Sequence, residues 1–153
     1  MSQAYLGKKT NYDKWDDLSE ENSLAQHKVA QQQLASLNKF QPTSLNTQTR
    51  LSLALLKDRI KNGLENFKFR HHGYNLSHMG GLHTQIPSFL MNIHRIDNIE
   101  DANNYITRLE AVKPLIKQLV INLKTSEALG YHLPDFEFPR LITSTQATIS
   151  GYP

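Results

Sequence analysis

TQTRLSLALLKDRIKNGLENFKFR, residues 47 to 70, is the stretch that decides the fold class. Its apolar residues recur at steps of three and four, the spacing that places side chains on one face of an α-helix. That face carries Leu53, Leu56, Ile60, Leu64 and Phe67, widened by Leu51 and Leu55. Gly63 costs such a helix about 1 kcal/mol relative to alanine, which so much apolar surface can offset. The pattern predicts a long helix at the core.

A second amphipathic helix is predicted at roughly residues 19 to 38. Ser19 can accept a hydrogen bond from an orphan backbone N–H at the start of this helix, and Glu20 and Glu21 suit the positive end of its dipole. One face then carries Leu24, His27, Ala30, Leu34 and Leu37. Because His27 lies on that apolar face, we interpret it as a half-buried, hydrogen-bonded structural residue.

Two more helices are predicted in the second half of the chain. One opens at Asn98, where Asp101 completes a capping-box-like pattern. The other follows Pro114 and ends toward Gly130, a suitable left-handed stop. Their stripes are Ala102, Tyr105, Leu109 and Val112 in the first, and Leu115, Leu119 and Leu123 in the second. Four helical stripes and almost no alternating pattern predict an all-α protein, a helical bundle or part of one.

The remaining segments lack a helical stripe. Residues 1–18 are expected to form an extended lead, and residues 71–87 a loop rich in histidine and glycine. Residues 135–141 alternate between polar and apolar. The overlapping stretch YHLPDFEFPR, residues 131–140, contains two prolines, which disfavour helical angles in the residue before them, so it is predicted to be extended. At this length one domain is the default, and residues 1–153 are interpreted as a single helical segment.

Composition limits the chemistry and the partners. The chain has no cysteine, which excludes disulfides, thiolate metal sites and a cysteine nucleophile. The net charge is +3, but the 17 basic residues are scattered among 14 acidic ones, so we expect no nucleic-acid partner. No apolar run reaches membrane-spanning length, and the first residues turn polar before a signal sequence can form. The sequence predicts a soluble chain without a targeting signal, and its compartment is undetermined.

Histidines give the chain its most site-like pattern, in and beside GYNLSHMGGLHTQIPSFLMNIH, residues 73 to 94. His72, His78 and His83 are spaced by six and five residues, which fits no helical pair of zinc ligands. A metal would require the loop to fold these imidazoles onto one ion, whereas hydrogen bonding to an irregular backbone needs no ion. We therefore expect no metal in this chain. If a metal site were present, these three histidines would be its candidate ligands. His94, near the end of a short predicted helix, is interpreted as a partly charged structural residue.

Catalytic motifs are missing from the sequence. It contains no GxSxG, GxxxxGK[ST] or GxGxxG pattern and no EF-hand ligand series. Its acidic pairs fall at predicted helix starts, where the helix dipole explains them, so no catalytic residue is named. The basic cluster from Lys68 to His72 interleaves cations with Phe69 and either contacts an anionic ligand or simply ends the helix.

Four stretches, in order, resemble the N-terminal part of the bacterial "domain of unknown function 885" family. They are YLGKKTNYDKWDDLS (5–19), HHGYNLSHMGGLHTQIPSFLMNIH (71–94), DANNYITRLEAV (101–112) and ALGYHLPDFEFPRLI (128–142). That family is similar to gluzincin-like metallopeptidases, long and mostly helical proteins that are often exported lipoproteins and carry an HExxH helix far later in the chain. No HExxH occurs in these 153 residues.

The resemblance implies that this chain is the non-catalytic helical portion of a zinc metallopeptidase, cut at both ends. The zinc, its ligands and the general base would lie in the remainder of the parent chain, the first expected partner. The parent would be exported, periplasmic or anchored as a lipoprotein. Apolar faces meant for that remainder would let the isolated chain self-associate. The alternative is a stand-alone helical module that binds a protein partner or an anionic ligand through residues 68–72.

The resemblance also draws attention to the segment from Gly80 to Pro87 as one wall of a peptide-binding cleft. Glycines let a peptide main chain approach closely and pair with exposed backbone groups. The expected substrate-lining residues are Gly80, Gly81, His83 and Gln85. The structural alternative is a glycine turn needed only to reverse the chain. Tyr105 and Arg108 also match residues typical of the family. We interpret Tyr105 as a packing residue and Arg108 as a member of an ion pair on the helix face.

Overall fold

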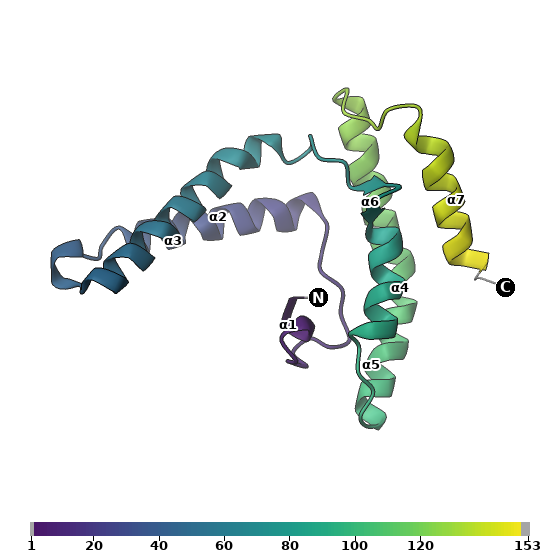
Figure 1. Cartoon of the computed structure of the whole chain (residues 1–153), viewed down its shortest axis with the longest axis horizontal. Helices are drawn as coiled ribbons and strands as arrows, with labels where there is room; N and C mark the ends of the chain where they lie inside the picture. Colours follow the sequence, from purple (N-terminus) through teal and green to yellow (C-terminus); the bar gives the residue numbers. More distant parts are fainter. Residues whose placement is uncertain (1, 151–153) are drawn as a thin grey trace. The chain divides into compact units, whose positions relative to one another are not determined.

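The computed structural model describes residues 2–150 (Figure 1). Nearly all regular structure is helical, so the predicted all-α class is confirmed; one antiparallel hairpin pairs β1 (Leu76–Ser77) with β2 (Gly80–Gly81). The chain was expected to be one segment, but its described residues form two compact units: unit 2 is Ser19–His72, and unit 1 holds the described residues before and after it. Within the described residues, no helix has the length and apolar character needed to span a membrane.

Unit 2 is built from two helices, α2 (Glu20–Leu37) and α3 (Thr47–Asn66), with short 3-10 turns η1 (Pro42–Ser44) and η2 (Phe67–Phe69). The side-chain oxygens of Ser19 and Asn46 accept backbone N–H bonds at 3.2 and 2.8 Å, which caps the first turns of α2 and α3. His27 is half-buried and stacks on Phe67 with ring centroids 4.1 Å apart. This packing supports the interpretation of His27 as a structural residue.

The prediction that the helix in residues 47–70 forms the core is wrong. The helix is present, but no residue of α2 or α3 is buried. Leu51, Leu55 and Leu56 keep 54%, 62% and 45% of their surface exposed. Two helices shield each other along one narrow line of contact, and this stripe is wide enough to meet more than one neighbour. Its outer leucines therefore remain at the surface.

The hydrophobic core lies in unit 1, which contains α4 (Leu82–Asn92), α5 (Ile99–Glu110), α6 (Val112–Ala128) and α7 (Glu137–Ser150). The buried side chains that pack together come from α4 and α6: Leu82, Ile86, Leu90, Leu115 and Leu119. Burial of each large aliphatic side chain contributes about 1.5–3 kcal/mol. As predicted, Asn98 caps α5 through a hydrogen bond of 2.9 Å, and Gly130 after α6 is left-handed, with φ of 86°.

Helix α4 begins earlier than the sequence indicated. The loop expected at residues 71–87 already ends at Gly81, and Pro87 lies inside α4 instead of before it. A proline at this position removes one helical hydrogen bond. Burial of four α4 side chains at helical spacing offsets that loss: Leu82, Ile86, Phe89 and Leu90.

Helix α7 was not predicted, and the extended structure expected at residues 131–140 is wrong from Asp135 onward, where a turn leads into the helix. Pro139 lies in the first turn of α7, where its missing N–H has no intrahelical acceptor to lose. The same proline therefore marks a helix start and not an irregular segment. In Figure 1, α7 is the yellow helix beside α4, which it contacts.

The N-terminal segment is not an extended lead throughout. Its first residues form the short helix α1 (Ser2–Tyr5), and two turns follow, with positive φ at Gly7 and Asn11. Tyr12 and Trp15 attach this segment to the helices. The Tyr12 hydroxyl accepts the Arg95 backbone N–H at 2.6 Å, and the Trp15 indole N–H donates to a carbonyl of α5 at 2.8 Å.

Candidate functional site

Backbone geometry explains the glycines of the hairpin. Gly81 has φ of 148°, and a Cβ there would lie 2.9 Å from the carbonyl oxygen of Asn75 and 2.9 Å from a methyl carbon of Leu76. Gly80 has φ of 154°, with open space where a Cβ would be. Both angles favour glycine, but only Gly81 is also required by close approach of the backbone. Chain reversal alone therefore accounts for Gly81.

His78, at the tip of the hairpin, connects it to α7. The Nδ1 atom lies 2.6 Å from Oε2 of Glu137, which also accepts the His78 backbone N–H at 3.2 Å. Glu137 is buried, and the hydrogen bonds from His78 lower the pKa of its carboxyl group from the ordinary value. This pair fixes the start of α7 against the hairpin.

His83, in the first turn of α4, forms a second connection to α7. Its Nε2 atom lies 3.4 Å from Oγ of Ser144, while Nδ1 is buried and, within residues 2–150, has no hydrogen-bond partner. Burial lowers the pKa of His83, so the imidazole is neutral near pH 7. A hydroxyl next to a neutral imidazole is the start of a nucleophilic triad, whose third member orients the other ring nitrogen. The described residues place no such group at Nδ1.

Helices α4 and α7 together line a groove of about 1030 Å³. Most of the surface that lines it is apolar, although five of its nine lining residues are polar or charged, and such a mixture is typical of sites that bind ligands. The apolar residues are Pro87, Met91, Pro139 and Ala147, and the charged or polar ones include His78, Arg140 and Ser144. Met91 is 74% exposed. The groove is therefore open to solvent along an apolar wall.

The four predicted substrate-lining residues do not share one surface. His83 and Gln85 are two positions apart in α4, so their side chains point to different sides, and His83 is buried while Gln85 is exposed. Gly80 and Gly81 lie in the hairpin, next to His78 and Met79. His83 reaches the groove only through Ser144, which lines it. A role of these four residues in substrate binding stays a prediction.

Arg108, in α5, is only 1% exposed. Its Nε donates to the carbonyl of Lys14 at 3.1 Å, and a terminal nitrogen donates to the carbonyl of Asn11 at 3.3 Å. The guanidinium carbon lies 5.2, 5.3 and 4.6 Å from the ring centroids of Tyr12, Trp15 and Phe89. Cations are attracted to the faces of such rings. Arg108 therefore holds the N-terminal segment against α4 and α5.

These contacts correct the predicted helix-face ion pair of Arg108. Its hydrogen-bond partners are backbone carbonyls and a ring nitrogen, and burial lowers its pKa from the ordinary value. The two carbonyl partners, of Lys14 and Asn11, lie more than 90 positions away in the N-terminal segment, so no spacing rule identifies them. The sequence feature that could have indicated this contact is the pair of aromatic residues Tyr12 and Trp15 in a segment outside the long helices. Backbone carbonyls of such a segment need hydrogen-bond donors from elsewhere in the chain.

His94 contacts two residues of α5, Arg108 and Asp101. Its Nδ1 lies 3.2 Å from a guanidinium nitrogen of Arg108, and its Nε2 lies 3.2 Å from the carbonyl oxygen of Asp101. Because arginine can only donate, Nδ1 accepts and Nε2 carries the proton, which makes the ring neutral. Burial lowers the pKa of His94. The interpretation of His94 as a partly charged residue is therefore wrong.

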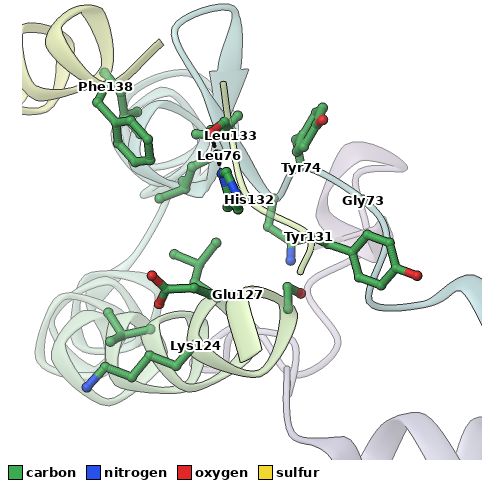
Figure 2. A pocket seen from close by; sticks show the side chains of 14 residues that line it. Gly73, Tyr74, Leu76, Lys124, Glu127, Tyr131, His132, Leu133 and Phe138 are labelled. Atoms are coloured by element: carbon green, nitrogen blue, oxygen red, sulfur yellow. Dashed lines mark hydrogen bonds between the residues drawn. The ribbon is translucent and has the colours of Figure 1, made fainter. Parts of the chain in front are cut away.

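A smaller cavity, of about 210 Å³, lies in unit 1 between the chain at residues 73–76, the C-terminal half of α6 and the start of α7 (Figure 2). It is lined mainly by apolar side chains: Leu76, Val120, Leu123, Leu133, Phe138 and Leu141. Ser126 also lines it, is 4% exposed, and has a hydroxyl oxygen without a hydrogen-bond partner among residues 2–150. An unsatisfied buried hydroxyl costs about 1–3 kcal/mol.

A family model described as bacterial protein of unknown function, DUF885, matches residues 1–153, the whole of this chain. The chain belongs to the DUF885 family. The resemblance noted for the four stretches of sequence is thereby confirmed. Comparisons with curated proteins and with solved structures gave no match.

The zinc implied by the DUF885 resemblance does not fit the residues of this chain. Within residues 2–150, no three histidine, aspartate or glutamate side chains are grouped so that they could hold a metal ion. Of the three candidate ligands, His78 pairs with Glu137 and His83 contacts Ser144. His72 contacts the ring of Phe69 edge-on, with centroids 5.1 Å apart. The three imidazoles do not form one site.

The basic cluster at residues 68–72 of this DUF885 chain is partly neutralised within unit 2. Arg70 donates two hydrogen bonds to Glu20, at 3.0 and 2.8 Å, and its guanidinium carbon lies 4.6 Å from the centroid of Phe67. His71 lies 3.8 Å from the same carboxylate. The hydrogen bonds from Arg70 lower the pKa of Glu20. An anionic ligand would have to compete with Glu20 for the cluster.

Proposed function

We propose that this chain is the non-catalytic helical part of a zinc-dependent metallopeptidase and that it supplies scaffold and one wall of a peptide-binding cleft. The sequence supports this proposal through the family resemblance and through the lack of an HExxH motif in these 153 residues. The observation that carries it is the open, mostly apolar groove lined by α4 and α7. Zinc and its ligands would belong to other polypeptide of the parent protein.

The chemistry of the groove suits a short stretch of unfolded polypeptide. Pro87, Met91 and Ala147 offer apolar surface for side chains, and the flexible thioether of Met91 adapts to different ones. Arg140 and His78 add groups that can bind a carboxylate or a carbonyl of the peptide. Binding through apolar surface with few fixed polar contacts favours breadth over sequence specificity.

A matched pair of methionine variants tests the groove. Met91→Lys places a charge in the apolar groove, whereas Met79→Lys places the same charge on the hairpin, at a residue that is 87% exposed and does not line the groove. Fluorescence anisotropy with a library of fluorescein-labelled decapeptides measures the affinity. We expect Met91→Lys to weaken binding by about 10-fold or more, because the charge would be desolvated by the peptide, and Met79→Lys to leave it unchanged.

Two results contradict the proposal. If no decapeptide binds the unaltered chain, or if both variants bind as tightly as it does, the groove is not a peptide wall. If the chain itself hydrolyses the labelled peptides, with liberated amines measured over several hours, the assignment as a non-catalytic part is wrong.

The expected partner, further polypeptide of the parent, is proposed to cover the exposed leucines of α3. Leu55 is 62% exposed although it belongs to the apolar stripe of that helix. With such surface open, the isolated chain is expected to sediment as a concentration-dependent mixture of monomer and larger species. Leu55→Glu should shift this mixture toward monomer, while Ser52→Glu, at an exposed residue of the same helix, should not. A chain that stays monomeric at all concentrations contradicts this expectation.

A further inference from the structure

We propose that the cavity beside Ser126 binds a small aromatic ligand that carries a single N–H or O–H group. The cavity and the α4–α7 groove have no lining residue in common. The proposal therefore goes beyond the peptide-binding function, and either can fail without the other.

The hydroxyl of Ser126 differs from the other helical hydroxyls of unit 1. Thr125, its neighbour, donates to the carbonyl of Ile121 at 3.0 Å, and Thr143, Thr145 and Thr148 each bond the carbonyl four positions earlier in the same way. This local bond is the usual partner of a helical hydroxyl. The Ser126 oxygen makes no such bond, although it is buried. A ligand atom in the cavity would supply the missing partner when the Ser126 side chain rotates its hydroxyl toward the cavity that the residue lines.

The size of the cavity sets the size of the ligand. An apolar cavity of about 150 Å³ holds benzene, and the cavity of this chain measures about 210 Å³. A substituted benzene or a bicyclic ring therefore fits, whereas a folded chain segment does not. In Figure 2 the apolar side chains of Leu76, Leu133 and Phe138 lie on one side of the lining residues, and the ammonium end of Lys124 points away from these residues.

The lining favours an aromatic ligand over an aliphatic one. Tyr74, Tyr131 and Phe138 contribute three aromatic side chains to the walls. Aromatic rings gain edge-to-face or offset contacts with such neighbours in addition to the burial of apolar area. Most of the lining surface is apolar, so a ligand with several polar groups would leave some of them unpaired, and ligands with one N–H or O–H are preferred over more polar ones.

Indole and indene, which have nearly the same shape, separate the hydrogen bond from the apolar contacts. Indole carries one N–H, and indene has a carbon in its place. Titration of the full chain with each compound, followed by two-dimensional NMR of its leucine methyl groups, gives both affinities. We expect saturable shifts at the cavity leucines with both, and tighter binding of indole by about 3- to 10-fold, the range of one net hydrogen bond.

Ser126→Ala is the decisive variant, because it removes only the hydroxyl. It should abolish the preference for indole, leave the affinity for indene unchanged, and raise the melting temperature of the free chain by relieving the unsatisfied oxygen. Thr125→Val, which removes the neighbouring hydroxyl that is already bonded, is the matched control and should keep the preference. Val120→Trp, at a cavity residue that is 43% exposed, should fill the cavity and weaken the binding of both indole and indene.

The ligand can be a free molecule or an aromatic side chain of another polypeptide, and a capped Gly-Trp-Gly peptide distinguishes these sources. Tighter binding of indole than of the tripeptide indicates a free ligand, and the reverse indicates a side chain. The proposal is overturned if neither compound nor the tripeptide shifts the cavity leucines. It is also overturned if Ser126→Ala binds indole as tightly as the unaltered chain, since the hydroxyl would then serve a water molecule or nothing.

Discussion

Nδ1 of His94 lies 3.2 Å from a guanidinium nitrogen of Arg108, and both side chains are buried. The imidazole can accept this hydrogen bond only when it is neutral, and the guanidinium is held by the carbonyls of Asn11 and Lys14 on its other sides. The residues just after α4, the last turn of α5 and the N-terminal segment therefore meet at one contact between a cation and a base. Protonation of His94 would place two positive charges together there.

This contact predicts a stability that falls as the pH decreases below about 6.5, the ordinary pKa of histidine. Burial lowers the pKa of His94 and of His83 in the folded chain. The unfolded chain therefore binds more protons in the window below that value, and unfolding is favoured there. Above the window this contribution is fully present. Urea unfolding at pH 7.5, 6.5 and 5.5 measures the dependence.

His94→Gln should reduce that pH dependence, because glutamine keeps a donor and an acceptor but does not titrate. His132→Gln, at an exposed histidine, should leave the slope as it is. The unaltered His83 maintains part of the dependence in both variants. An identical slope in His94→Gln and the unaltered chain would show that the buried pair does not sense pH.

Arg108→Lys is expected to destabilise the chain by about 2–4 kcal/mol, although the charge is conserved. A lysine cannot reach two carbonyls and an imidazole at once from the same buried position, and it leaves acceptors unpaired. Arg95→Lys, at an arginine whose side chain is 77% exposed, is the control and should change stability by less than about 0.5 kcal/mol. Equal unfolding free energies for the two variants would mean that Arg108 is not an anchor.

Alanine substitutions at the two hairpin glycines distinguish the cost of an unfavourable backbone angle from the cost of a steric clash. Both Gly80 and Gly81 have φ near 150°, but only at Gly81 would the new Cβ lie within 3.0 Å of other atoms. Each change is expected to cost about 1–3 kcal/mol from its backbone angle, with an additional loss for Gly81→Ala. Thermal unfolding of both variants measures the difference. If Gly80→Ala is the more damaging, the close approach of Asn75 and Leu76 is not what requires glycine.

Gly63 offers a change in the opposite direction. It lies inside α3, and apart from its chain neighbours and the backbone of that helix no atom lies within 4 Å of an added Cβ, so Gly63→Ala should stabilise unit 2 by about 0.5–1 kcal/mol. Gly130→Ala should destabilise by a similar amount, because Gly130 has open space but a φ of 86°. Circular dichroism during heating compares the two. A loss of stability in Gly63→Ala would contradict the helix geometry described for α3.

Local rules predicted the elements whose signals are local. The stripes of α2, α3, α5 and α6, the caps at Ser19 and Asn98 and the left-handed Gly130 all depend on residues within a few positions of each other. They failed at α4 and α7, where Pro87 and Pro139 lie within helices that burial or a first-turn position makes acceptable. A proline in the sequence shows which backbone hydrogen bond is lost, but it does not show which tertiary contacts compensate for that loss.

The candidate site was less accessible to sequence reasoning than the fold. The sequence directs attention to the segment from Gly80 to Pro87, whereas the groove is formed by α4 with α7, a helix that the alternating pattern does not indicate. Burial of His83 and exposure of Gln85 depend on where α4 begins. The orphan hydroxyl of Ser126 has no sequence signal, since its neighbour Thr125 occupies the same helix and is bonded normally.

The chain has one tryptophan, Trp15, whose indole donates to the Arg108 carbonyl and faces Phe89 at a centroid distance of 5.4 Å. Its emission spectrum depends on that enclosed setting and would move to longer wavelength if the ring entered water. The intrinsic fluorescence of Trp15 therefore reports whether the N-terminal segment is packed against the helices of unit 1, without any attached dye.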